Sequence, residues 1–200
     1  DGLDIHKATA AKVFGIDLDD VTRDMRSKAK AVNFGIAYGQ GAFGLAQNLG
    51  ISRGEAREII DSYVKQFPGI TKYKESSIKI ARKTGYAETI MGRRRYLPDI
   101  NSKNYVVRSA AERNAINAPI QGSAADVIKV AMINLQKALK EKGFKSKMLL
   151  QVHDELVFDA HKSEVEEITP IIRKEMEKAH ELIVPLVVDI STGNNWLEAH

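Results

Sequence analysis

Cysteine is absent from this chain of 200 residues, and so is any long apolar run. Without cysteine the protein has no disulfides and no thiolate metal ligands. No stretch approaches the roughly 18 apolar residues of a membrane-spanning helix, so we expect no membrane partner. Internal repeats and low-complexity segments are also missing, which argues against a repeat architecture. The composition that remains, with 44% hydrophobic and 28% charged residues, is that of a globular protein.

Positive charge is concentrated in the first half of the chain. Residues 1–100 hold 17 Lys and Arg against 12 Asp and Glu, a net charge of +5, whereas residues 101–200 hold 13 against 14, a net charge of −1. A polyanion would prefer the first half. A mildly basic protein without such a partner would show the same balance, so charge alone does not decide the function.

Hydrophobic periodicity predicts an α+β protein with a boundary near residue 102. Residues 1–102 are expected to be mainly helical, and residues 103–200 to combine helices with an antiparallel sheet. The first part should hold helices at residues 5–14, 23–39, 52–67 and 69–84, then two short β-segments around a basic turn at residues 93–95. The second should hold helices at about 105–117 and 121–142, a hairpin over 147–160, a helix from 163 to about 182 and a last strand at 185–191.

The stretch RDMRSKAKAVNFGIAYG, residues 23–39, carries Arg26, Lys30, Phe34 and Tyr38 at steps of four residues. Each such step turns about 40° further round a helix, so the four side chains cover an arc of about 120°. A second stripe, facing nearly the opposite way, is wholly apolar and is the expected core face. Its members are Met25, Ala29, Val32 and Ile36.

Two cations followed by two aromatic rings on an outer face match a ligand with an anionic end and a flat end. Arg26 and Lys30 would meet the anion near the helix N-terminus, where the helix dipole also favours negative charge. Phe34 and Tyr38 offer ring faces on which a base can stack. A nucleoside triphosphate has this shape. A charged face with its aromatic rings tucked under neighbouring helices is the alternative.

The sequence RSKAKAVNFGIAYG resembles the fingers-helix motif of family A DNA polymerases, the bacterial DNA polymerase I type. Arg26, Lys30, Phe34, Tyr38 and Gly39 match its pattern of Arg, Lys, Phe and Tyr-Gly, each separated by three residues. The likeness extends from DIH near the start of the chain to NNWLEAH at its end. It implies a fingers subdomain in the first part of the chain and the C-terminal part of a palm subdomain in the second.

The resemblance also implies a role for each side chain of this helix. Arg26 and Lys30 would hold the triphosphate of an incoming dNTP, and Lys30 would donate a proton to the pyrophosphate leaving group. Phe34 would pack on the incoming sugar and base. Tyr38 would occupy the position of the template base until the fingers close. His6, in DIHKATA, would donate to the triphosphate, with an ordinary core or surface histidine as the alternative.

The stretch QVHDELVF places His153, Asp154 and Glu155 at the tip of the predicted hairpin. A charged hairpin tip explains these residue types, and so do carboxylates for a divalent cation. The stretch is similar to the palm motif of the same family, which implies that Asp154 ligates Mg²⁺, that Glu155 is an auxiliary catalytic carboxylate and that His153 lies against the primer-terminal nucleotide. Two Mg²⁺ ions about 3.5–4 Å apart would then support transfer of a nucleotide to a primer 3′-hydroxyl.

The second aspartate of such a two-metal site is missing from this chain. The family supplies it from a DYSQIELR-like motif upstream of DIH, and Asp17, Asp19 and Asp20 do not resemble that motif. The chain also opens with DGLDIHKATA rather than with methionine. We therefore expect a part of a longer cytoplasmic, nucleoid-associated bacterial enzyme. It would be inactive without its N-terminal remainder, which holds the thumb and the first palm segment.

The segment ERNAINAPIQGSAAD carries Arg113, Asn117 and Gln121, again at steps of four. Pro119 is expected to break the helical register before Gln121. Polar groups that tie two helices together would explain the three side chains. So would contacts with primer–template DNA, because the minor groove presents acceptors at similar places in every base pair. The match to the family pattern favours the contact with DNA.

Two other functions are compatible with these residues. The first is a metal-dependent phosphohydrolase built on His153-Asp154, but such sites need further His and Asp ligands on helices, and here the pair lies between strand-like runs. The second is a non-catalytic nucleic-acid-binding fragment, because one of the two carboxylate motifs is absent.

Overall fold

Two compact units make up the chain, of which the computed structural model describes residues 4–199. The first unit consists of the residues up to Glu88 together with Gly92–Pro119, and the second of Thr89–Met91 together with the residues from Ile120 onward. Each unit combines helices with a two-stranded antiparallel sheet, which confirms the predicted α+β class. The expected boundary near residue 102 separates fingers from palm by function, and it stays a prediction.

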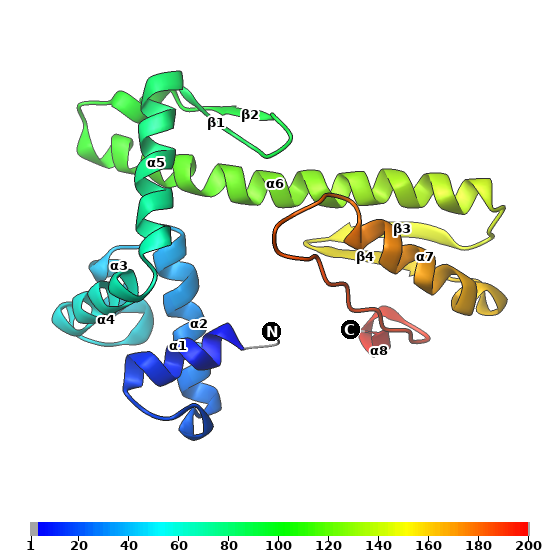
Figure 1. Cartoon of the computed structure of the whole chain (residues 1–200), viewed down its shortest axis with the longest axis horizontal. Coiled ribbons are helices and arrows are strands. Elements are labelled where there is room, and N and C mark those ends of the chain that lie inside the picture. The colour runs from blue at the N-terminus through cyan, green and yellow to red at the C-terminus, as the bar shows by residue number, and fades with distance from the viewer. Residues whose placement is uncertain (1–3, 200) are drawn as a thin grey trace. The chain divides into compact units, whose positions relative to one another are not determined.

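Helices dominate the first unit (Figure 1). The helices expected at residues 5–14, 52–67 and 69–84 are confirmed within one residue at each end, and the one expected at 23–39 ends at Ala37. Helix α3 was not expected, because eight residues between two glycines show no clear period. In chain order the elements are α1 (Ile5–Phe14), η1 (Leu18–Asp20), α2 (Arg23–Ala37), α3 (Ala42–Leu49), α4 (Arg53–Gln66), α5 (Pro68–Thr84), β1 (Tyr86–Glu88), β2 (Arg94–Tyr96) and η2 (Pro98–Asn101).

The apolar stripe of α2 is the core face of the first unit, as the sequence predicts. Val32 and Ile36 are almost fully buried and pack with Leu45 of α3 and with Ala56 and Tyr63 of α4. Full burial of a side chain the size of valine or isoleucine stabilises a fold by about 1.5–3 kcal/mol. Because this stripe fixes the orientation of α2, the cationic and aromatic stripe is turned away from the core.

Helix α6 (Tyr105–Glu141) is continuous, so the expected break at Pro119 is wrong. A proline removes one backbone N–H and crowds the carbonyl four residues earlier, which weakens a helix locally. Here the hydroxyl of Tyr73, on α5, donates to the Ile116 carbonyl at 2.8 Å. The carbonyl that loses its helical donor to Pro119 is that of Ala115, and Tyr73 bonds to the next one along the chain, so α5 is attached to α6 close to the weakened turn.

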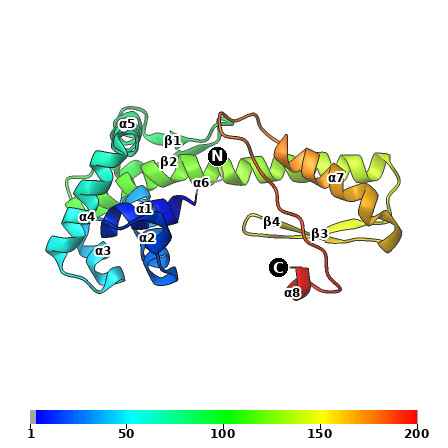
Figure 2. The same cartoon turned by 60° about the horizontal axis from the view of Figure 1, so that its bottom comes forward.

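The core of the second unit lies between the second half of α6, α7 and a hairpin (Figure 2). Leu135 and Leu139 of α6 pack with Ile168 and Ile172 of α7. The predicted hairpin is confirmed: its two strands pair antiparallel, with an irregularity in register between Met148 and Leu150. The elements are β3 (Lys147–Val152), β4 (Glu155–Asp159), η3 (Lys162–Glu164), α7 (Val165–Glu177) and α8 (Trp196–Ala199).

The segment after α7 departs from the prediction. The helix expected to run to about residue 182 ends at Glu177, and residues 185–191, expected to form a strand, adopt no regular structure. A strand needs a neighbouring strand for its backbone groups, but α7 takes those of Val188. The Val188 N–H donates to Glu177 Oε1 at 3.2 Å, and its carbonyl accepts from Arg173. Among the described residues, no helix has the length and apolar character needed to cross a membrane.

Candidate functional site

The outer face of α2 carries the predicted row of cations and rings. Arg26, Lys30 and Phe34 are exposed, and Tyr38, at the end of the helix, is half-buried. The rings of Phe34 and Tyr38 are stacked, with their centroids 6.0 Å apart and an angle of 15° between their planes. The two rings therefore form a short parallel stack that continues the line of the two cations.

Helix α1 brings His6 to the same face. The His6 ring centroid lies 5.7 Å from that of Phe34, and its Nδ1 lies 2.9 Å from the side-chain amide of Asn33. Although the two residues are far apart in the sequence, the fold places the predicted histidine beside the predicted phenylalanine. The ring thus lies at the edge of the aromatic surface, held by a residue of α2.

Asp4 also contacts this face, through a hydrogen bond with Arg26 that the sequence did not predict. One of its oxygens, Oδ2, accepts from Arg26 Nε at 2.6 Å, and the other caps α1 by accepting the backbone N–H groups of His6 and Lys7, each at 3.0 Å. The Arg26 hydrogen bond, helped by these backbone donors, lowers the pKa of Asp4 to about 2. An aspartate directly before a helical pattern is an N-cap signal, which could have identified it.

Asn33 and Thr9 are the other residues that sequence reasoning missed. Both are buried, and the Thr9 hydroxyl lies 3.0 Å from the side chain of Asn33. Asn33 follows Val32 on the apolar side of α2, where a polar residue is uncommon and needs a hydrogen-bond partner. A polar residue directly beside the apolar stripe was the available signal.

The two cations of the row have different surroundings. Arg26 is paired with Asp4, whereas the Lys30 ammonium has no ion pair with any of residues 4–199. Lys28, one turn from Asp24 on the same helix, is paired with it at 2.8 Å. Lys30 is therefore the cation of this row whose charge is not yet balanced by a neighbour.

The end of α2 is fixed by a glycine. Gly39 has φ of 82°, in the left-handed region that glycine adopts without strain. The backbone N–H of Gly39 donates to the Ile36 carbonyl, and that of Gln40 donates to the Gly35 carbonyl at 2.7 Å. These two bonds form the Schellman motif that closes many helices. The turn sets the orientation of Tyr38, which directly precedes the glycine.

The three predicted DNA-contacting side chains of α6 are distributed over both units. Arg113 is exposed and donates to the Ser109 hydroxyl at 3.0 Å. The Asn117 side-chain oxygen is buried and makes no hydrogen bond within the described part of the chain. Gln121 is exposed and belongs to the second unit. Their contact with DNA stays a prediction.

The tip of the β3–β4 hairpin is a two-residue turn. Val152 pairs with Glu155, so His153 and Asp154 form the turn itself. His153 has φ of 53°, which is unusual for a residue with a side chain and costs about 1–3 kcal/mol. The Gln151 side-chain amide donates to the His153 carbonyl at 3.0 Å and helps to hold this conformation. Asp154 is exposed, and Glu155 is half-buried at the start of β4.

Asp154 fits one side of a Mg²⁺ site. An exposed carboxylate on a fixed turn is an oxygen donor of the kind that Mg²⁺ prefers, and Mg²⁺ commonly uses one or two carboxylates together with substrate phosphates. Within residues 4–199 no three His, Asp or Glu side chains gather closely enough to hold a metal. For a Mg²⁺ site at Asp154, further donors would have to come from a substrate or from outside the described residues.

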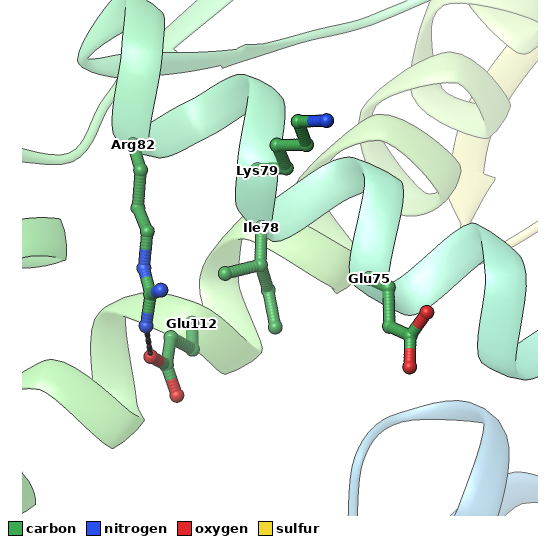
Figure 3. Close-up of a pocket in the computed structure, with 5 residues that line it drawn as sticks. All are labelled: Glu75, Ile78, Lys79, Arg82 and Glu112. Carbon is green, nitrogen blue, oxygen red and sulfur yellow. Dashed lines mark hydrogen bonds and ion pairs between the residues drawn. The ribbon is translucent and has the colours of Figure 1, made fainter.

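A cleft of about 410 Å³ lies elsewhere in the first unit, between α5 and α6 (Figure 3). Arg82 donates to Glu112 at 2.6 Å, and Arg108 lies 3.7 Å from the same carboxylate. Arg82 and Glu112 line this cleft as an ion pair, together with Glu75, Ile78 and Lys79, and none of the predicted site residues is among them.

A row of cations and aromatic rings in the first unit, and an exposed carboxylate turn in the second, are features typical of proteins that handle nucleotides. Comparison with known proteins identifies the family. The chain belongs to DNA polymerase family A, whose family model matches residues 1–198.

The relatives are full-length polymerases of which this chain matches a part. The chain is 54% identical over 199 residues to DNA polymerase I of Lactococcus lactis subsp. lactis (strain IL1403). The matched region is 99% of this chain and 23% of that protein. The chain is 52% identical over 197 residues to DNA polymerase I of Bacillus subtilis (strain 168), covering 98% and 22%. A solved structure described as the POL domain of Pol1 from M. smegmatis, in complex with DNA primer-template and dNTP, matches with a TM-score of 0.95 and 47% identity, over 99% of this chain and 35% of that chain.

Proposed function

We propose that this chain forms the fingers subdomain and the C-terminal part of the palm of a bacterial DNA-directed DNA polymerase. The observation that carries the proposal is the outer face of α2, where Arg26 and Lys30 precede the stacked rings of Phe34 and Tyr38, with His6 beside them. The names of the relatives, and the primer-template DNA and dNTP bound to the solved neighbour, support it.

Arg26, Lys30 and His6 bind the triphosphate of the incoming dNTP in this proposal. The guanidinium of Arg26 offers forked donors that fit phosphate oxygens, and Lys30 offers a compact charge. Because Lys30 has no ion pair within residues 4–199, its ammonium is available both to hold the phosphates and to donate a proton to the pyrophosphate as it leaves. Lys30 is therefore the catalytic residue of the fingers.

Phe34 and Tyr38 bind the flat part of the substrate. Phe34 packs on the sugar and base of the dNTP, and Tyr38 occupies the template-base position until the fingers close. The stacked geometry of the two rings supports this assignment, since a base can continue the same stack. Gly39, in its left-handed turn, gives the chain the change of direction that places Tyr38 at the end of the row.

Asp154 provides the carboxylate of the palm. It would hold Mg²⁺, with Glu155 as an auxiliary catalytic carboxylate and His153 against the primer-terminal nucleotide. When bound, a pair of Mg²⁺ ions neutralises phosphate charge and favours deprotonation of the primer 3′-hydroxyl. The strained turn at His153 supports a functional role for this tip, because strain of this kind persists where a specific geometry is needed.

Arg113, Asn117 and Gln121 contact the primer–template duplex in this proposal. Their donors suit the acceptors that every base pair presents in the minor groove, so contact does not depend on sequence. The rest of the polymerase supplies the thumb, the first palm segment and the second metal-binding aspartate. The chain alone is therefore inactive, and the complete enzyme acts on DNA in the bacterial cytoplasm.

Nucleotide affinity tests the proposed face of α2. The suitable protein is a chimera in which this chain replaces the matching residues of the Lactococcus lactis DNA polymerase I. Arg26→Ala should weaken dNTP binding by roughly 10–100-fold, because a hydrogen bond to a charged group contributes about 1.5–3 kcal/mol. Arg23→Ala, on the same helix but outside the row, is the matched control. Equal effects of the two substitutions on the dissociation constant would contradict the proposal.

A further inference from the structure

Three polar groups meet between α1 and α2, behind the face just described. Thr9 is 2% exposed and Asn33 is 8% exposed. The Thr9 hydroxyl oxygen lies 2.8 Å from the Ile5 carbonyl oxygen and 3.0 Å from one end of the Asn33 amide. The other end of that amide lies 2.9 Å from His6 Nδ1. The three contacts form one chain that runs from a backbone carbonyl to the histidine ring.

The number of available protons decides which group donates in each of these three contacts. The Thr9 hydroxyl has one proton, and it can donate to only one of its two neighbours. If it donates to the Asn33 oxygen, the contact with Ile5 has no proton. If it donates to Ile5, the Asn33 side chain must present its NH₂ group to Thr9 and its oxygen to His6. A half-turn of the amide makes that exchange in place.

Only the second arrangement supplies a proton to all three contacts. Thr9 then donates to the Ile5 carbonyl, Asn33 donates to the Thr9 oxygen, and His6 Nδ1–H donates to the Asn33 oxygen. In the first arrangement the Thr9 and Ile5 oxygens would face each other at 2.8 Å with no proton between them, which is repulsive, so the second arrangement is favoured. It requires that His6 carry its proton on Nδ1.

We propose that Asn33 and Thr9 are positioning residues that hold the proton of neutral His6 on Nδ1 and leave Nε2 as an acceptor. This inference rests on the proposed nucleotide site. A phosphate oxygen is also an acceptor, so it can bind the ring only when Nε2 carries a proton as well. Binding of a triphosphate beside His6 therefore moves one proton from solvent to Nε2, and the ring becomes an imidazolium.

The charged groups around His6 fit this step. On α1, Asp4 accepts the His6 backbone N–H, and Lys7 is paired with Asp19 of η1 at 3.6 Å. On α2, Arg26 is paired with Asp4, and Lys30 stands on the same face. A triphosphate bound to Arg26 and Lys30 would bring negative charge to this face, and a neighbouring negative charge favours a cationic ring.

Helix α4 also approaches α1, and it does so through apolar side chains. There Ile59 of α4 lines a small cavity of about 90 Å³ together with Val13 and Phe14, at the opposite end of α1 from His6. The charged groups named around His6 therefore come from α1, η1 and α2.

Long-range ¹H–¹⁵N NMR spectra of the ¹⁵N-labelled chain distinguish the two neutral forms of a histidine ring. We expect His6 at pH 8 to be protonated at Nδ1 alone in the free chain, and at both nitrogens once dTTP is added. The exposed His153 is the internal reference. A free chain with His6 protonated at Nε2 alone would overturn the proposal, whether or not nucleotide binds.

Two other outcomes separate this inference from the proposed function. If the amide signals of Arg26 and Lys30 shift with dTTP while His6 Nε2 stays unprotonated, the proton uptake is wrong. If neither α2 nor His6 responds to dTTP, the nucleotide site in this chain is wrong, and the Nδ1 assignment is supported or rejected by the spectrum of the free chain alone.

Substitutions of Thr9 test the cause. Thr9→Val removes the hydroxyl at nearly constant shape, so the Asn33 amide is free to turn and His6 should shift toward the Nε2–H form. Thr9→Ser keeps the hydroxyl and should keep the Nδ1–H form. If His6 keeps its proton on Nδ1 in a folded Thr9→Val variant, the Thr9 hydroxyl does not fix the position of that proton. The spectrum of the unsubstituted chain decides the assignment even if Thr9→Val does not fold.

Discussion

The outer face of α2 and the tip of the β3–β4 hairpin carry the two parts of the proposed chemistry, and they are constructed differently. On α2 most of the predicted side chains are held by neighbours: Arg26 by Asp4, Phe34 by the stacked ring of Tyr38. At the hairpin tip, Asp154 projects from a two-residue turn that a single strained residue and one side-chain hydrogen bond help to hold.

The two proposed ligands would account for this difference. A nucleotide is long, and recognising both its ends takes a row of side chains on a rigid element. A Mg²⁺ ion needs a few oxygen donors, which can come from separate segments and from the substrate itself. We therefore expect the α2 face to be largely complete within this chain, and the hairpin tip to depend on residues outside it. The following predictions test that contrast in the chimera or in the chain.

Asp154→Ala in the chimera should give the largest effect. Loss of the only carboxylate that the turn offers should reduce primer extension by about 10³-fold or more, since removal of one member of a catalytic set commonly costs this much. Binding of primer–template DNA should stay nearly unchanged. Asp159→Ala, at the other end of β4, is the control and should retain activity. Extension by the Asp154 variant at the unsubstituted rate would remove Asp154 from the metal site.

Lys30→Ala should lower the rate of nucleotide incorporation by about 10²-fold. A positioned proton donor typically contributes this much, and the lost charge should also weaken use of the dNTP. Single-turnover incorporation measures the effect. Lys28→Ala, on the same helix and paired with Asp24, is the matched control. If the two lysine variants behave alike, Lys30 has no special place in the row.

Phe34→Tyr should change selectivity more than rate. The added hydroxyl would lie where the sugar of the dNTP packs, and it can replace a polar contact that a dideoxynucleotide lacks. We expect acceptance of dideoxynucleotides relative to dNTPs to rise by about tenfold or more. Phe43→Tyr, an exposed position on α3, should leave the ratio unchanged. Unaltered discrimination in Phe34→Tyr would contradict the placement of Phe34 against the sugar.

Glu164→Gln should have the smallest effect, on stability alone. The Ser146 hydroxyl donates to the Glu164 carboxylate at 2.7 Å, and the backbone N–H groups of Lys145 and Ser146 also donate to it. These bonds lower the pKa of Glu164 below its ordinary value of 4.5. A carboxylate whose pKa is lowered by folding stabilises the fold fully at pH values above its ordinary pKa. This stabilisation is lost as the pH falls through the lowered pKa.

Thermal melts of the chain from pH 7 to pH 3 measure this effect. The melting temperature of Glu164→Gln should lie below that of the unsubstituted chain at pH 7, and the gap should close as pH falls below 4.5. Glu166→Gln, exposed in the first turn of α7, is the control and should show no gap. A gap that does not change with pH would mean that the hydrogen bonds to the Glu164 carboxylate do not depend on its charge.

Local sequence signals were sufficient for most of the fold. Ser52 and Glu55 form the capping box that opens α4, and the turn at His153-Asp154 joins two strands, as the two flanking apolar runs predict. Contacts between distant parts of the sequence could not be predicted. Pro119 predicts a break in the helix, and only the fold reveals that Tyr73 donates to the Ile116 carbonyl, one turn before the proline. The run PLVVDIS has the composition of a strand, but in the fold α7 engages its backbone.

The candidate site divides in the same way. The spacing of Arg26, Lys30, Phe34 and Tyr38 fixes their common face as soon as the segment is helical. No spacing links them to His6 or Asp4, which come from another helix and approach α2 only because the core packs α1 across it. Residues that position other residues, rather than the ligand, carry the weakest sequence signal.

Primer extension with Mg²⁺ and all four dNTPs, by this chain and by the chimera, tests the central claim most directly. The account predicts no extension by the chain alone and template-directed extension by the chimera, because the upstream segment restores the second metal-binding aspartate. Extension by the chain alone would contradict the assignment of an incomplete palm. A folded chimera that binds primer–template DNA but does not extend it would contradict the polymerase assignment itself and favour a nucleic-acid-binding role.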